Sequence, residues 1–193
     1  FAKLRAAGLE PSVLGKDASL LDAFAKLLEY PGEDYARAAQ ELHRALAPTH
    51  PEAASCLEGF AQAIRGKSLE QLQELFVQTF DLNPVCALEV GWHLFGEAYE
   101  RGAFLVKMRQ ELRRHEIAES SEMPDHLGHV LPLLARMKPE EARKFATAFV
   151  LPALEKMLPG LEGAKNPYEG VLKAVRSVVA ARYASVSEEV VHE

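Results

Sequence analysis

The side chains with the clearest potential for chemistry gather in one short stretch, where Asp125, His126 and His129 lie within five positions. Carboxylates and imidazoles are common zinc ligands, and a zinc site usually draws a further ligand from another segment, for which His93 and His115 are the candidates. One hypothesis is therefore a helical metal-dependent hydrolase centred on His93, His126 and His129, which would retain stoichiometric metal on purification. The alternative is that His126 and His129 begin a helix, one making a hydrogen bond and the other solvated.

The tripeptide Pro124-Asp125-His126 can also act without a metal. Pro124 lacks a backbone donor and stiffens the chain just before an apolar segment. Asp125 is placed to cap the following helix by accepting hydrogen bonds from its first free amides. His126 would then lie in the first turn, with a ring that donates and accepts near neutral pH. Such a corner can present polar groups to a ligand, although an ordinary helix start is the simpler interpretation of the tripeptide alone.

Other patterns that carry chemistry do not occur in the sequence. It contains no glycine-rich phosphate loop and no nucleophile elbow. Cys56 and Cys86 lie inside predicted helices, where a small buried side chain is the simpler role. The 193 residues include 28 acidic and 22 basic ones, for a formal charge of −6. This balance argues against a nucleic-acid partner and is compatible with a basic peptide.

The sequence also predicts where the protein works. The two cysteines show no disulfide pattern, which favours the reducing cytosol. No apolar run approaches the roughly 20 residues that a membrane span needs. The start at Phe1 lacks the apolar core and the cleavage site of a secretory signal. We therefore expect a cytoplasmic protein that does not span a membrane.

Hydrophobic residues recur at helical spacing almost throughout the chain, and no segment shows the alternation of a half-buried strand. We expect an all-α fold, a single globular helical domain of about nine helices over residues 1–193, with a frayed polar tail at about 185–193. Ser19 or Asp17 is expected to cap the first helix, and Ser68 with Gln71 forms a capping-box pattern. The expected helices, with a kink at Pro152, cover about 19–28, 33–46, 51–65, 68–80, 84–95, 97–115, 127–137, 138–158 and 171–179.

Three short motifs occur in the same order as in a known family. They are Phe76-Val77-Gln78-Thr79-Phe80-Asp81-Leu82, Phe95-Gly96-Glu97-Ala98-Tyr99-Glu100-Arg101-Gly102 and Glu122-Met123-Pro124-Asp125-His126-Leu127. From about Leu20 to Met137 the chain resembles the NarJ branch of the TorD/DmsD family, the chaperones dedicated to molybdenum-containing respiratory oxidoreductases. The stretch between Leu88 and Phe95 departs from the nitrate reductase chaperones. The client therefore stays open between nitrate reductase and a relative such as a selenate, chlorate, dimethyl sulfide or hydrocarbon dehydrogenase.

The resemblance implies an all-helical chaperone that is not an enzyme. It implies that the chain binds the N-terminal segment of the apo-catalytic subunit and holds it until the molybdenum cofactor is inserted. That cofactor belongs to the client, and no cofactor is expected on this chain. The choice between monomer and homodimer stays open. A ligand-sensing or scaffolding helical domain is a further alternative.

We expect recognition of the client peptide as a helix in an apolar groove, with Asp125 meeting a client Lys or Arg. Leu72 and Leu75 are expected in the core, whereas Phe76 and Trp92 can belong to the core or to the groove. The candidate residues for binding the client peptide are Glu122, Pro124, Asp125, His126, Phe76, Phe80, Trp92, Tyr99 and Arg101.

Overall fold

The computed structural model describes residues 11–163 and 165–184, with the backbone alone for residues 11–17. Nearly all of its regular structure is helical. The described residues contain no β-strand, and their one strand-like pairing is an isolated antiparallel bridge between Glu89 and His126. The prediction of an all-α fold is therefore confirmed. The expected tail at 185–193 lies outside the described residues, and the single-domain prediction for residues 1–193 stays a prediction.

Some helical elements follow one another without interruption, with short π or 3-10 turns between α-helices. Taken as continuous segments, they make nine helices in the described part of the chain, besides the short turn η2. The elements in chain order are α2 (Pro11–Leu27), α3 (Tyr35–Leu46), α4 (Pro51–Ala63), α5 (Leu69–Phe76), the π-turn η1 (Val77–Asp81), the 3-10 turn η2 (Pro84–Cys86), α6 (Val90–Phe95), α7 (Tyr99–Arg114), α8 (Leu127–Arg136), α9 (Pro139–Phe145), the π-turn η3 (Ala146–Val150), α10 (Leu151–Met157), the 3-10 turn η4 (Leu158–Gly160) and α11 (Tyr168–Tyr183).

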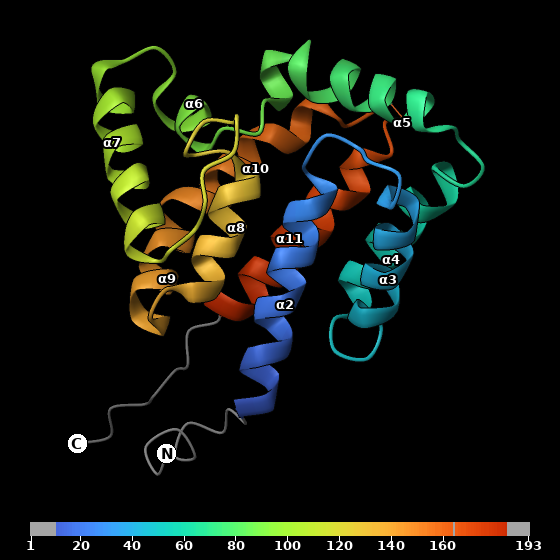
Figure 1. Ribbon diagram of the computed structural model, residues 1–193, viewed down its shortest axis with the longest axis horizontal. Helices are drawn as coiled ribbons and strands as arrows, with labels where there is room; N and C mark the ends of the chain where they lie inside the picture. Colours follow the sequence, from blue (N-terminus) through green and yellow to red (C-terminus); the bar gives the residue numbers. More distant parts are fainter. Residues whose placement is uncertain (1–10, 164, 185–193) are drawn as a thin grey trace.

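Helices α2 and α11 lie in the middle of the molecule, with α3 and α4 on one side and α7, α8 and α9 on the other (Figure 1). Helix α11 packs against α4, and α2 packs against α8. Helix α5 crosses one end of this arrangement and continues into η1. The site described below lies where η1, η2, α6 and the start of α8 approach one another. No helix in the described residues is both long enough and apolar enough to cross a membrane.

A buried tyrosine pair fixes the position of η1. The hydroxyl of Tyr35 donates to the Leu27 carbonyl at 2.6 Å, and the Tyr168 hydroxyl lies 2.7 Å from that of Tyr35. The ring of Tyr168 packs edge-on against Phe76 and Phe80, at centroid distances of 6.0 and 4.7 Å. Aromatic pairs in this geometry contribute roughly 0.5–1.5 kcal/mol beyond their buried area. The two phenylalanines are therefore anchored from behind by α11.

Several local expectations hold and others are wrong. The capping box is confirmed, because the Gln71 amide donates to Ser68 Oγ at 3.3 Å and the Ser68 amide donates to Gln71 Oε1 at 2.9 Å. The first helix already begins at Pro11, so neither Ser19 nor Asp17 caps it.

Just before Pro152, where we expect a kink, the helix contains the π-turn η3. Proline cannot donate a backbone hydrogen bond. The helix reaches Pro152 through η3, where the Leu151 amide donates to the Ala146 carbonyl, five residues back. Pro152 then lies in the first turn of α10, where a missing donor costs little. The regular α-helical hydrogen bonding is therefore interrupted in the turn before Pro152.

The expected helix over 84–95 is also wrong. The chain forms a 3-10 turn at Pro84–Cys86, becomes extended, and starts α6 only at Val90. The extended residues pair with the segment before α8: the Leu127 amide donates to the Leu88 carbonyl at 2.9 Å, and the Val90 amide donates to the Asp125 carbonyl at 3.0 Å. A long-range pairing of this kind overrides local helical preference, and sequence periodicity does not reveal it.

Candidate functional site

The corner formed by Pro124, Asp125 and His126 is buried rather than projecting. Asp125 has 0 % of its surface exposed, and His126 has 5 %. The carboxylate Oδ2 of Asp125 accepts the Gly91 amide hydrogen at 2.7 Å, and Oδ1 has no hydrogen-bond partner. Burial raises the pKa of Asp125, and the hydrogen bond from Gly91 opposes this shift. Asp125 therefore joins α6 to the segment before α8.

Two expectations for Asp125 are consequently wrong. It does not cap α8, because that role falls to His126, whose Nδ1 accepts the Gly128 amide hydrogen at 3.0 Å. It also cannot meet a client Lys or Arg directly in this conformation, because it has no exposed surface. The physical reason is the pairing with residues 88–90, which turns Asp125 toward Gly91.

The glycine at position 91 makes this arrangement possible. A Cβ atom there would lie 2.7 Å from Asp125 Oδ2 and 2.8 Å from a ring carbon of Phe104. Any larger residue would therefore push the carboxylate or the ring away. The sequence analysis missed Gly91, and its only local signal is a glycine inside a helix.

His126 presents a neutral ring to solvent-accessible space. Burial, and then the nearby His129, lower its pKa to about 4. Because Nδ1 accepts a hydrogen bond from Gly128, the single proton of the neutral ring is on Nε2. His126 lines a pocket, so this N–H is a donor available to a ligand.

His129 and His93 use ring nitrogens for hydrogen bonds within the fold. Nε2 of His129 accepts the Ser120 amide hydrogen at 3.0 Å, and its Nδ1 donates to the Met123 carbonyl at 2.9 Å. Nε2 of His93 donates to the Ala87 carbonyl at 2.5 Å. The expectation that one histidine of the pair is solvated is wrong, because His126 and His129 are both buried and hydrogen-bonded.

The ligand set of the metal-dependent hydrolase does not assemble. Both ring nitrogens of His129 are used, and His126 uses Nδ1 to cap α8. Within residues 11–163 and 165–184, no group of three or more His, Cys, Asp or Glu side chains could hold a metal ion. The arrangement of these residues therefore does not favour the hydrolase.

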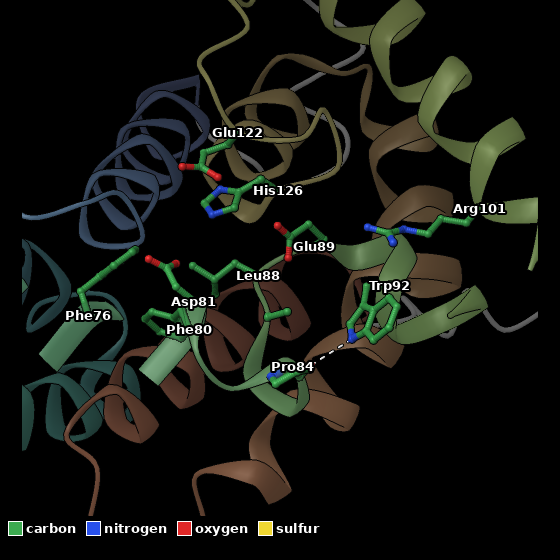
Figure 2. Close-up of a pocket in the computed structure, with 11 residues that line it drawn as sticks. Phe76, Phe80, Asp81, Pro84, Leu88, Glu89, Trp92, Arg101, Glu122 and His126 are labelled. Carbon is green, nitrogen blue, oxygen red and sulfur yellow. Dashed lines mark hydrogen bonds between the residues drawn. The ribbon is translucent and has the colours of Figure 1, made fainter. Parts of the chain in front are cut away.

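A pocket of about 480 Å³ opens beside the corner, and we call it the acidic pocket. Its walls come from the end of α5, η1, η2, the extended residues 87–89, α6, the start of α7 and the segment before α8 (Figure 2). Its volume is within the usual range for ligand sites. It is large enough to take a few side chains of a partner. The lining residues are Phe76, Phe80, Asp81, Pro84, Ala87, Leu88, Glu89, Trp92, Arg101, Glu122 and His126.

The charge in the acidic pocket is unbalanced. Asp81, Glu89 and Glu122 contribute three carboxylates, Arg101 contributes one guanidinium, and none of the three carboxylates has an ion-pair partner in the described part of the chain. Burial raises the pKa of Glu89, and the nearby charges of Asp125 and Glu122 raise it further, while a backbone hydrogen bond and the charge of Arg101 oppose the shift. Burial also raises the pKa of Asp81. A cationic group entering the pocket would relieve this repulsion.

The structure brings together six of the nine predicted site residues. Phe76, Phe80, Trp92, Arg101, Glu122 and His126 all line the acidic pocket. Pro124 and Asp125 are buried behind it. Tyr99 is 91 % exposed and is not part of the lining. Leu72 is buried in the core as expected, and Leu75 is partly buried against it.

Sequence reasoning missed five lining residues, namely Asp81, Pro84, Ala87, Leu88 and Glu89. Asp81 belongs to a motif that resembles the family, so a signal for it was present. It faces the pocket at the end of the π-turn η1, a type of turn that is frequent at functional sites. Glu89 carries no local signal, because its position depends on the pairing with His126.

A second pocket of about 330 Å³ lies between α7 and the segment from α9 to η3, and we call it the apolar pocket. Phe104, Met108, Met137, Phe145 and Phe149 form most of its wall, with charged residues at its edge. These charges are largely paired: Arg114 lies 3.4 Å from Glu111 and 3.5 Å from Glu141.

These features define a class of molecule: an all-helical protein with an acidic, aromatic-walled pocket at the junction of η1, α6 and α8. The family described as "Nitrate reductase delta subunit" matches residues 32–170, which is most of the chain and includes every residue that lines the acidic pocket. The chain belongs to this family.

Two curated relatives carry a more specific name. The "Nitrate reductase molybdenum cofactor assembly chaperone NarJ" of Escherichia coli strain K12 is 29 % identical to this chain over 121 residues. The protein of the same name from Escherichia coli O157:H7 gives the same match. The alignment covers 61 % of this chain and 51 % of either relative, so the chain spans about half the length of the curated relatives it matches.

Proposed function

We propose that this protein is an assembly chaperone for a molybdenum-containing oxidoreductase of the nitrate reductase type, working in the cytoplasm without catalytic turnover. In this proposal it binds the N-terminal segment of the apo-catalytic subunit and holds the subunit until the molybdenum cofactor is inserted. Family membership and the names of the relatives support the assembly role. The acidic pocket is the observation that supports peptide binding.

The pocket suits a segment that carries both cationic and apolar side chains. Its three carboxylates exceed its one guanidinium by two formal charges, which favours a client Lys or Arg. Phe76, Phe80 and Leu88 offer apolar surface in the same space, while Leu82 and Met123 are large apolar residues exposed beside lining positions. A basic amphipathic segment matches both properties.

In this proposal, some residues contact the client segment and others hold the pocket in shape. Glu89, Glu122 and Asp81 would meet the cation, and Nε2–H of His126 would donate to a client carbonyl. Asp125 is a positioning residue, because it holds α6 against the segment before α8 through the Gly91 amide. Pro124 is buried and restricts the same segment.

The expected free-energy contributions correspond to reversible peptide binding. Each large apolar side chain of the client contributes roughly 1.5–3 kcal/mol when it is fully buried. Ordering a disordered segment costs on the order of 2–5 kcal/mol. Three anchors therefore leave at most about 7 kcal/mol, and polar contacts and the remaining surface have to supply the rest of the roughly 8 kcal/mol that a micromolar Kd requires. Reversible binding suits a chaperone, which has to release its client.

The test is a binding measurement with a labelled peptide that copies the N-terminal segment of the nitrate-reductase-type catalytic subunit from the same organism. The parent protein should bind with a Kd of roughly micromolar, and added salt should weaken binding. The double variant Glu89→Gln with Glu122→Gln should bind about ten-fold more weakly, while circular dichroism and melting stay unchanged.

The matched control is Glu140→Gln, which removes an exposed carboxylate on α9 outside the acidic pocket. It should bind as the parent does. Absence of peptide binding to the parent protein would contradict the proposal. Equal binding by the parent and the double variant would place the peptide elsewhere on the molecule.

A further inference from the structure

Arg101 is held in place inside the acidic pocket. Its guanidinium carbon lies 5.3 Å from the centre of the Trp92 ring, which is the geometry of a cation–π contact. The indole is fixed in turn, because Trp92 Nε1 donates to the Pro84 carbonyl at 2.9 Å (Figure 2). The position of the guanidinium is therefore set before any ligand arrives.

The donors of this guanidinium are not used within the fold. Arg101 forms no ion pair with a carboxylate of the described residues, and its Nε is buried without a hydrogen-bond partner. Two arginines on the same helix behave differently: Arg109 pairs with Glu119 at 2.8 Å, and Arg114 pairs with Glu111 and Glu141. A buried donor without a partner is costly, so Arg101 is a position where a ligand acceptor would be favourable.

The positive and negative groups occupy different parts of the pocket. Figure 2 shows Arg101 beside Trp92 at one end, and Asp81 with Phe76 and Phe80 at the other. Glu89 lies between the two ends. A partner that crosses the pocket therefore meets carboxylates along most of its path and a guanidinium at one end.

We infer that Arg101 determines specificity by binding a carboxylate side chain of the client segment. The pocket then selects a segment that carries a cation and an acid at a fixed spacing, rather than any basic peptide. This inference rests on the proposed function and adds to it the class of sequence that the pocket accepts.

The chemistry of arginine supports this role. A guanidinium presents its N–H donors in a planar fork that matches a carboxylate, and the resulting charge-assisted bonds are stronger than neutral ones. Stacking on Trp92 already restricts the side chain, so less conformational entropy is lost on binding. A lysine would keep the charge but would lose both the fork and the planar stacking.

The experiment scans glutamate through the polar positions of the labelled N-terminal peptide described above, with alanine at the same positions as reference. With the parent protein, one position should bind roughly ten-fold more tightly as glutamate than as alanine. With Arg101→Ala this preference should vanish, and Arg101→Lys should keep only part of it. Arg113→Ala, an exposed arginine on the same helix outside the pocket, is the matched control and should keep all of it.

If the removal of Arg101 disturbs the fold, a charge reversal at this position still tests the inference. Arg101→Glu should reverse the preference, so that arginine at the selected peptide position binds more tightly than glutamate. The inference is overturned if no position of the bound peptide prefers glutamate, or if Arg101→Ala preserves the preference. Either result leaves the proposed function intact, whereas failure of the parent peptide to bind removes the proposed function itself.

Discussion

The acidic pocket and the apolar pocket both border α7, and they differ in how their charges are balanced. At the apolar pocket, Arg114 pairs with both Glu111 and Glu141, so three of the four charged residues at its edge are paired within the protein. At the acidic pocket, Glu89, Glu122 and Arg101 form no close ion pair among the described residues, although the charge of Arg101 acts on Glu89 from a distance. Like charges held together without counter-charges destabilise a fold unless a ligand neutralises them. We therefore expect ligand binding at the acidic pocket and a packing role for the apolar one.

Gly91→Ala is expected to have the largest effect, because it disturbs both pockets. Its added methyl group would collide with Asp125 behind the acidic pocket and with Phe104 in the wall of the apolar pocket. Overpacking of this kind costs about 2–3 kcal/mol. Chemical denaturation should show that loss, and the labelled peptide should bind several-fold more weakly. Full stability together with full binding would mean that Asp125 does not position the acidic pocket.

Phe149→Ala tests the packing role of the apolar pocket. The Phe149 ring is half-buried, and its centre lies 5.2 Å from that of Phe104 and 5.5 Å from that of Phe145. Its removal should lower the free energy of unfolding by about 2 kcal/mol, below the usual cost for a fully buried phenylalanine. Peptide affinity should stay within about two-fold. A large loss of peptide affinity at unchanged stability would reverse the comparison and make this pocket the binding site.

The smallest expected effect is a dependence of peptide binding on pH. Burial raises the pKa of Glu89 above its ordinary value, and the charged form is the one that attracts a cation. Affinity should therefore be highest above this raised pKa and fall as the pH drops through it, starting above the ordinary glutamate value of about 4.3. Fluorescence anisotropy should show a roughly three-fold loss as the solution is acidified.

Glu89→Gln separates this effect from other titrations in the pocket. Asp81 and Glu122 also face the bound segment, whereas His126, with a pKa of about 4, is neutral until the pH is lower still. The Gln variant should lose most of the pH dependence. An unchanged pH profile in this variant would mean that Glu89 does not cause the effect.

The sequence was sufficient to predict the all-α fold class and most of the helices. Leu20, Phe24 and Leu28 fall on one helical face and are buried, and the Ser68–Gln71 capping box starts its helix where expected. These features depend on neighbours within one or two turns, so local spacing reveals them. The family resemblance added the motifs around Phe80, Arg101 and His126.

Sequence analysis predicted the site only in part. Phe76, Trp92 and Arg101 lie in one pocket as proposed, but Glu89 reaches it through a bridge to a distant segment. The same bridge turns Asp125 inward. Periodicity cannot predict such a pairing, because it is fixed by two backbone hydrogen bonds between residues far apart in the chain.

The bridge between Glu89 and His126 also sets an order of events during synthesis. The walls formed by η1 and α6 leave the ribosome well before the segment that closes the acidic pocket. Contacts between distant segments form only after the intervening chain has been made and its ends have met. A growing chain therefore has no complete acidic pocket until Leu127 has emerged and paired with Leu88. The acidic pocket thus becomes complete only when the two distant segments have folded together.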